Sequence, residues 1–173
     1  MGRVRSWQRL EILCQTTTDE QFPKSRLSRM KIVHVEDNAA DADLLKEAFE
    51  SIGISVQIRL FQDAREALKA LELEQPDNDS STPDIIVLDL NLPKMDGREL
   101  LKRLKENAQL KRIPVIILST SSLDQDIAYC YENYANSYIV KPQRFVDYKR
   151  VAASVNEYWS STVVLPQSVF RGY

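Results

Sequence analysis

The chain has 173 residues, 43% of them hydrophobic and 28% charged, with a formal net charge of -2. These values are typical of a globular protein with about one domain. The nearly balanced charge does not favour nucleic acid or an anionic membrane as a partner, and no apolar run approaches the roughly 18 residues that a membrane-spanning helix needs.

Residues 1–29 differ in composition from the rest of the chain, because basic residues outnumber acidic ones there. Trp7, Leu10, Leu13 and Cys14 fall at helical spacing and allow one short amphipathic helix. Three interpretations stay open for this N-terminal extension. It is loosely attached, it lies upstream of a true start at Met30, or it forms a helix that binds a partner.

From Met30 onward, apolar runs alternate with stretches of helical periodicity. The runs predict strands at 31–35, 56–60, 85–88, 113–118 and 137–140. The periodic stretches predict helices at about 40–52, 64–71, 96–106, 124–134 and 144–159. Gly53 suits the end of the first helix, since glycine adopts a left-handed cap at little cost. The polar segment 74–83 is predicted to be a loop.

Strands that are apolar on both faces and alternate with helices predict a parallel sheet covered on both sides. We expect one doubly wound α/β domain at residues 30–161, followed by a tail at 162–173. This tail is too short for a DNA-binding module, so the predicted output is a changed protein surface, with no DNA or membrane partner. Cys14 and Cys130 provide no disulfide framework, and the N-terminus provides no secretory signal, so we expect a cytoplasmic protein.

Polar residues follow the ends of four predicted strands. They are Glu36 and Asp37, then Asp89, then Ser119 and Thr120, and finally Lys141. The carboxyl ends of parallel strands meet at one edge of a sheet, so these side chains should converge. Packing does not explain them, because buried like charges repel and need a counter-ion. Carboxylates without His or Cys favour a hard cation, and we expect Mg²⁺.

Such a site suits phosphoryl transfer. A carboxylate beside Mg²⁺ can attack phosphorus and become an acyl phosphate, while a lysine and a hydroxyl bind the remaining oxygens. We predict Asp89 as the nucleophile, with Lys141 pairing with the phosphate and Ser119 hydrogen-bonding to it. The predicted metal ligands are Asp37 and Asp89 directly, Glu36 through water, and the backbone carbonyl of Asn91.

The motifs that carry these residues resemble those of bacterial response-regulator receiver domains over about residues 30–160. The matching segments are Val35–Asn38 (VEDN), Ile85–Gly97 (IIVLDLNLPKMDG), Ile117–Thr120 (ILST) and Val140–Pro142 (VKP). The resemblance implies the flavodoxin-like strand order 2-1-3-4-5. It also implies a signalling protein and not an enzyme. Its phosphoryl group would come from a sensor histidine kinase, and it would take part in its own phosphorylation and dephosphorylation.

The resemblance implies further roles for residues around the site. Ser119 would move toward the phosphate after modification, and Tyr138 would turn inward with it as a switch. The Lys141–Pro142 peptide bond is expected to be cis. Thr120 stands where receivers often have alanine, and its larger side chain is expected to restrict the motion of the aromatic ring.

A closer resemblance is to the single-domain regulators that accompany phytochrome-type histidine kinases. It rests on the long loop at 74–83 and on the C-terminal segment Glu157–Thr162 with Leu165-Pro166. It implies a phosphorelay component with a link to light signalling. We expect phosphorylation to change a surface within residues 110–160, through which the chain would form a homodimer.

Several residues have simpler interpretations. His34, the only histidine, lies within the first strand and is predicted to be a core residue. Asp41, Asp43 and Glu47 are predicted to form a solvated helix face. Tyr129, Tyr131 and Tyr134 cannot all face the core, so one or two should be exposed, either singly or as part of a self-association patch.

Two other functions compete with phosphoryl acceptance. One is an adaptor that keeps the receiver fold and works without phosphate, although such chains usually lose a catalytic residue and none is missing here. The other is a Mg²⁺-dependent phosphohydrolase. These enzymes place an aspartate as general acid–base two residues after the nucleophile, where this chain has Asn91.

Overall fold

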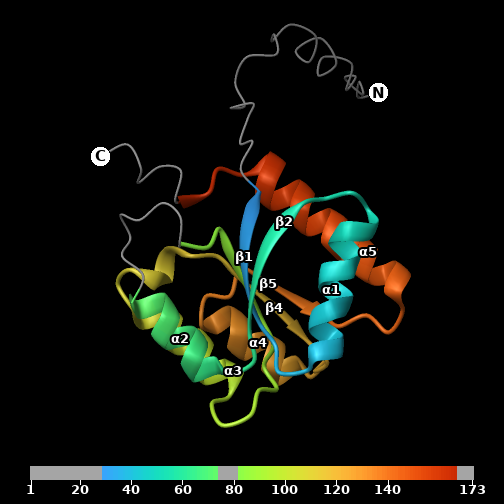
Figure 1. The fold of residues 1–173 in the computed structure, drawn as a ribbon. Helices are drawn as coiled ribbons and strands as arrows, with labels where there is room; N and C mark the ends of the chain where they lie inside the picture. Colours follow the sequence, from blue (N-terminus) through green and yellow to red (C-terminus); the bar gives the residue numbers. More distant parts are fainter. Residues whose placement is uncertain (1–28, 74–81, 167–173) are drawn as a thin grey trace, which may run out of the picture.

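The computed structural model describes residues 29–73 and 82–166 of the chain. The N-terminal helix considered around Trp7, most of the predicted loop at 74–83 and the end of the C-terminal tail lie outside these residues. In the described part, five parallel strands form one sheet in the order β2-β1-β3-β4-β5 (Figure 1). The strands are β1 (Met30–Val35), β2 (Val56–Phe61), β3 (Ile85–Leu88), β4 (Val115–Ser119) and β5 (Ser137–Val140). The predicted doubly wound, flavodoxin-like order is confirmed.

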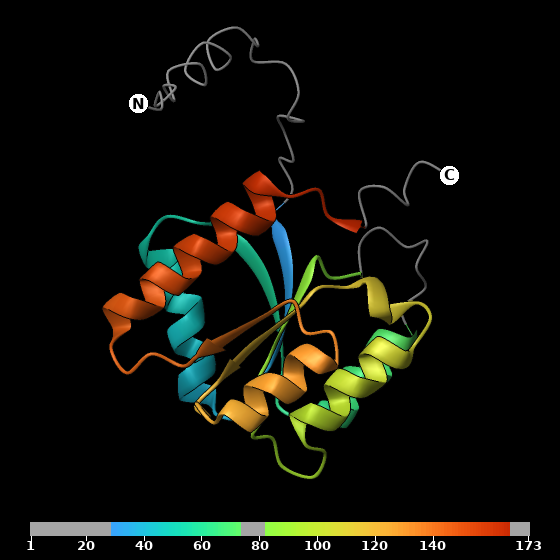
Figure 2. The same cartoon turned by 180° about the vertical axis from the view of Figure 1, so that it is seen from behind.

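Helices cover both faces of this sheet, as Figures 1 and 2 show. They are α1 (Ala39–Ser51), α2 (Ala64–Leu73), α3 (Gly97–Glu106), α4 (Asp124–Glu132) and α5 (Phe145–Asn156). On one face, Phe49 of α1 and Tyr148 of α5 join a core with Ile32. On the other, Leu68, Leu101 and Cys130 bring α2, α3 and α4 into a second core. Each strand contributes to both cores because successive side chains point to opposite faces.

Local sequence fixes the helix ends that matter for the site. Asn38 caps α1, and its Oδ1 accepts a hydrogen bond from the Ala40 amide at 3.0 Å. At the other end, α1 stops at Ser51, and Gly53 follows two residues later with a left-handed φ of 73°, in line with its predicted role at the helix end. Asp96 caps α3 by accepting from the Arg98 amide at 2.7 Å. Gly97 then lies so close to the Asp89–Leu90 backbone that a Cβ there would overlap the Asp89 carbonyl.

Several predicted element boundaries differ from the structure by one to three residues. The strand predicted at 113–118 begins only at Val115, because Pro114 has no amide to donate and the Ile113 amide donates to Leu110 in a 3₁₀ turn at Leu110–Arg112. The helix predicted at 124–134 ends at Glu132, and Tyr134 adopts a left-handed φ of 63°. The last helix ends at Asn156 and continues as a wider π-helical segment, Glu157–Thr162.

Most predictions for isolated residues are confirmed. His34 is 1% exposed, and burial lowers its pKa to about 4. Cys130 is a buried free thiol, as expected, and burial raises its pKa to about 11. Tyr129 packs partly buried against the second core, whereas Tyr131 and Tyr134 are exposed. None of the helices in the described ranges has both the length and the apolar character needed to span a membrane.

Candidate functional site

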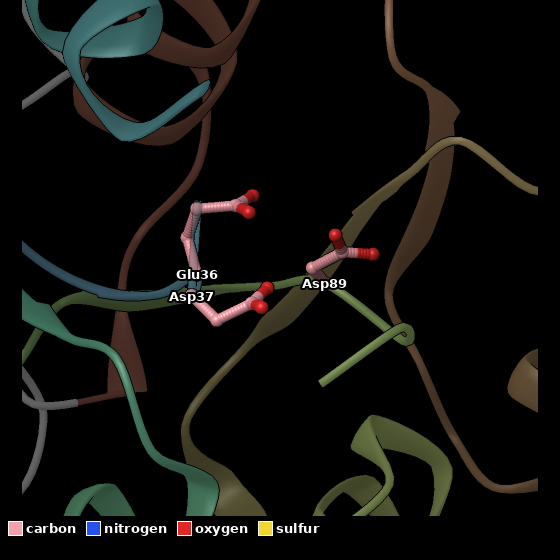
Figure 3. A group of neighbouring side chains, drawn as sticks. All are labelled: Glu36, Asp37 and Asp89. Atoms are coloured by element: carbon pink, nitrogen blue, oxygen red, sulfur yellow. The ribbon is translucent and has the colours of Figure 1, made fainter. Parts of the chain in front are cut away.

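Strand register brings the predicted acidic residues together at the carboxyl edge of the sheet. Val35 of β1 pairs with Leu88 of β3, so the residues that follow each strand emerge side by side. Glu36, Asp37 and Asp89 each offer a carboxylate oxygen, and these atoms lie within 4.8 Å of one another. Figure 3 shows Glu36 and Asp37 extending from the end of β1 toward Asp89. Glu36 and Asp89 are buried, whereas Asp37 is exposed.

Lys141 supplies the positive charge of this group. It follows β5, its side chain is 4% exposed, and its Nζ lies 2.6 Å from Glu36 Oε2 and 2.8 Å from Asp89 Oδ2. Burial alone would lower the pKa of Lys141, but hydrogen bonds to its carboxylate partners outweigh that effect and raise it. Lys141 is therefore a charged ammonium at neutral pH.

The Lys141–Pro142 peptide bond corrects one prediction. All peptide bonds in the described ranges are trans, so the expected cis bond is wrong. The trans form is the more stable isomer of an X–Pro bond by about 0.5–1 kcal/mol, and Lys141 reaches its carboxylate partners with the bond in this form. The Lys141 amide donates to the Ser119 carbonyl at 2.8 Å and so extends the pairing of β5 with β4.

Asp89 is held as an ionised carboxylate. Burial raises its pKa, but hydrogen bonds from Lys141, from the Ser119 hydroxyl and from the Asn91 amide outweigh burial, so the pKa lies below its ordinary value. The Asn91 amide lies 3.2 Å from Asp89 Oδ1. For Glu36 the balance is reversed, and burial keeps its pKa above the ordinary value despite the contact with Lys141.

Asp41 is a site residue that sequence reasoning missed. It was predicted to share a solvated face of α1 with Asp43 and Glu47, which are indeed exposed. Its Oδ2 instead lies 2.8 Å from Lys141 Nζ. The prediction was wrong because helical periodicity does not reveal a long side chain that arrives from another element. The sequence feature that indicates the position of Asp41 is Asn38. A helix cap at Asn38 places Asp41 in the first turn of α1, at the same edge of the sheet as the other site residues.

The remaining predicted residues also lie at this edge. Ser119 ends β4, is fully buried and hydrogen-bonds to Asp89. Thr120 is exposed, and its hydroxyl accepts a hydrogen bond from the side-chain amide of Asn91 at 3.1 Å. Tyr138 in β5 packs partly buried against the second core, and its hydroxyl donates to the Ser121 carbonyl at 3.0 Å. The switch role of Tyr138 and the effect of Thr120 on its ring stay predictions.

A second charged group, which we call the Arg98 cluster, lies beside the site and comprises Asp96, Arg98, Ser121 and Asp126. Arg98 lies between two carboxylates, 2.7 Å from Asp126 and 3.0 Å from Asp96. The Ser121 hydroxyl donates to Asp126 at 2.5 Å. This cluster therefore connects α3 and α4 to the loop whose Ser121 carbonyl accepts from Tyr138.

The acidic residues fit a divalent cation. Glu36, Asp37 and Asp89 provide oxygen donors within reach of one ion, which is the donor type that Mg²⁺ and Mn²⁺ prefer. Lys141 alone does not balance these carboxylates together with Asp41. The site thus combines an excess of buried negative charge with one ionised, hydrogen-bonded aspartate as a nucleophile.

Comparison with known proteins agrees with this arrangement. The family model of the response regulator receiver domain matches residues 32–152. The response regulator Rcp1 of Synechocystis sp. is 37% identical over 135 residues, which cover 78% of this chain and 92% of Rcp1. The probable methanogenesis regulatory protein FilR2 of Methanothrix harundinacea is 42% identical over 128 residues, which cover 74% of this chain and 82% of FilR2.

Solved structures give the same result. The phosphorylated cyanobacterial phytochrome response regulator RcpA has a TM-score of 0.73 at 40% identity, covering 80% of this chain and 99% of RcpA. The Mn²⁺-bound form of Rcp1 has a TM-score of 0.69 at 37% identity, covering 78% of this chain and 97% of Rcp1. The resemblance predicted from the motifs is confirmed, and the chain belongs to the response regulator receiver domain family.

Proposed function

We propose that the chain is a single-domain response regulator that accepts a phosphoryl group on Asp89 from a sensor histidine kinase. The observation that carries this proposal is the state of Asp89, a buried carboxylate with a lowered pKa, 2.8 Å from the Lys141 ammonium. It lies among the carboxylates that can bind a divalent cation. Membership of the receiver family supports the same function and the role of a signalling protein.

Each residue of the site has a separate role in phosphoryl transfer. A carboxylate oxygen of Asp89 forms a bond to phosphorus while the bond from phosphorus to the donor's imidazole nitrogen breaks, and the imidazole keeps the electron pair. Lys141 and Ser119 bind oxygens of the transferred group. Asp37, Asp89, Glu36 through water and the Asn91 carbonyl would hold Mg²⁺. When bound there, the ion neutralises negative charge on the transferring group.

We further propose that the output is a protein surface within residues 110–160. Apolar side chains are exposed on this part of the chain, among them Leu123, Tyr131, Tyr134, Val140 and Val146. A homodimer through this surface, changed by phosphorylation, would be the readout. The similarity to RcpA, a cyanobacterial phytochrome response regulator, supports a phytochrome-type kinase as the donor, and a cytoplasmic location is part of the same proposal.

The competing functions gain no support from the site. A phosphohydrolase needs an acid two residues after the nucleophile, and the Asn91 amide at that position hydrogen-bonds to Thr120. An adaptor would not need an ionised Asp89 with Lys141 beside it.

The first test is the intact mass of the protein after incubation with acetyl phosphate and Mg²⁺. We expect a gain of one phosphoryl group that requires Mg²⁺ and is absent in Asp89→Asn. The same measurement is made with phosphoramidate, a donor with a phosphorus–nitrogen bond. This second donor shows whether a negative result with acetyl phosphate reflects only a preference for one donor. Failure with both donors, under conditions that label another receiver, would argue for the adaptor.

A further inference from the structure

The carboxylate partners of Lys141 differ in their relation to the metal site. Glu36 and Asp89 belong to the group of residues whose oxygens can bind one ion. Asp41 does not belong to it, although its Oδ2 is as close to Lys141 Nζ as that of Asp89, at 2.8 Å. Asp41 is also the outermost of the partners, because its side chain is 26% exposed and that of Glu36 is 1% exposed.

Asp41 owes its place to the start of α1. The Asn38 side chain accepts from the amides of Ala40 and Asp41 at 3.0 and 3.5 Å and fixes the first helical turn. This turn directs the Asp41 carboxylate toward Lys141, which is 100 residues further along the chain. The contact therefore joins α1 to the residue that follows β5.

Phosphoryl transfer changes the other two partners but not Asp41. An oxygen of Asp89 becomes the bridging oxygen of an acyl phosphate, and Glu36 would share its negative charge with a cation bound at the site. Both changes weaken their hold on the ammonium, which must keep its direction while it binds a phosphoryl oxygen. An ammonium has three N–H donors, so the bond to Asp41 does not occupy the donor that now points to Asp89.

We propose that Asp41 is a positioning residue that holds the Lys141 ammonium toward Asp89 during phosphoryl transfer. This inference rests on the proposed function. It predicts that loss of Asp41 slows the transfer step without weakening the binding of Mg²⁺. If Asp41 instead competed with the phosphoryl group for Lys141, its loss would accelerate the transfer.

The test compares Asp41→Ala and Asp41→Asn with Asp43→Ala as a matched control, since Asp43 is an exposed carboxylate two residues further along α1. Phosphorylation by acetyl phosphate is followed by intact mass while the donor and Mg²⁺ are varied separately. We expect the maximal rate of Asp41→Ala to fall about tenfold, the loss that corresponds to one charged hydrogen bond. Asp41→Asn keeps an acceptor oxygen and should recover part of the rate, and Asp43→Ala should match the wild type.

The Mg²⁺ concentration at half-maximal rate separates positioning from general damage. It should change less than about twofold in both Asp41 variants, a difference of well under one kcal/mol. A wild-type maximal rate, a faster rate, or a slower rate that excess Mg²⁺ restores would each overturn the proposal. Thermal melting shows whether Asp41→Ala has a folding defect. If it has one, the rate of Asp41→Asn decides between the outcomes, because asparagine has nearly the same shape as aspartate. If the wild type itself is not labelled, the proposed function fails rather than this inference.

Discussion

The acidic site and the Arg98 cluster lie next to each other and contain the same kinds of groups, yet their charge balance differs. Arg98 is 26% exposed between two carboxylates, one of which, Asp96, is 53% exposed and solvated. In the site, Lys141 is 4% exposed and faces Glu36, Asp41 and Asp89, with Asp37 nearby. Buried negative charge in excess is costly, and a fold keeps it where a cation or a reaction uses it. The Arg98 cluster, in contrast, connects elements.

The largest expected effect is on Lys141, whose removal leaves its buried partners without a cation. We expect Lys141→Met to reduce the free energy of unfolding by about 3 kcal/mol in the absence of divalent cations. Urea denaturation at pH 7.5 measures this loss. A variant as stable as the wild type would show that the buried carboxylates do not need Lys141 as a counter-ion. The acidic site would then not differ from the Arg98 cluster in its charge balance.

Addition of Mg²⁺ should stabilise the site selectively. An ion that binds only the folded state at one hundred times its dissociation constant adds about 2.7 kcal/mol. We therefore expect the melting temperature to rise with Mg²⁺ in the wild type and in Asp126→Ala, and to rise much less in Asp37→Asn. An equal rise in all three proteins would place the bound ion elsewhere.

The pH dependence of stability depends on His34, which lies in β1 close to the acidic site. Burial lowers its pKa to about 4. Its unfolded-state pKa is about 6.5, so between these values the unfolded chain binds a proton that the folded protein does not. Stability is therefore lost as pH falls from 6.5 to 4, by about 2 kcal/mol at pH 5. Urea denaturation across this range should show a shallower slope for His34→Gln, and an unchanged slope would assign the pH dependence to other groups.

The smallest effect is expected in the Arg98 cluster. Asp126→Ala removes the hydrogen bonds that Arg98 and Ser121 donate to this largely buried carboxylate. Solvent reaches the Arg98 side chain, which is 26% exposed, and screens its charge, so the loss should be about 1 kcal/mol. Phosphorylation by acetyl phosphate should persist in this variant. A complete loss of labelling would mean that the cluster belongs to the reacting site and does not merely connect α3 and α4.

The fold could be predicted from the sequence because each strand is a short segment that is either apolar throughout or, as in β2, alternates apolar and polar residues, and because each helix is periodic. The bounds of β3 and β5 were predicted to the residue. Glu36, Asp37, Asp89, Ser119 and Lys141 were found because each directly follows or ends a strand, and register then brings strand ends together.

Contacts between side chains from distant parts of the chain could not be predicted from the apolar pattern. The Asp41–Lys141 pair and the Arg98–Asp126 pair join separate elements, and neither leaves a periodic signal in the sequence. The cis bond was inferred from family resemblance alone, and the structure has the trans form instead. The helix ends at Glu132 and Asn156 depend on backbone geometry after the last periodic residue, which the apolar pattern does not specify.

The close approach of Gly97 to the Asp89–Leu90 backbone limits where the reacting group can move. Because the start of α3 packs against the Asp89 main chain, the backbone there cannot move back when the Asp89 side chain gains the bulk of a phosphoryl group. The added volume must be accommodated on the open side, toward exposed Thr120 and half-buried Ser121. Substitutions should therefore be tolerated poorly at Gly97 and better at exposed Thr120.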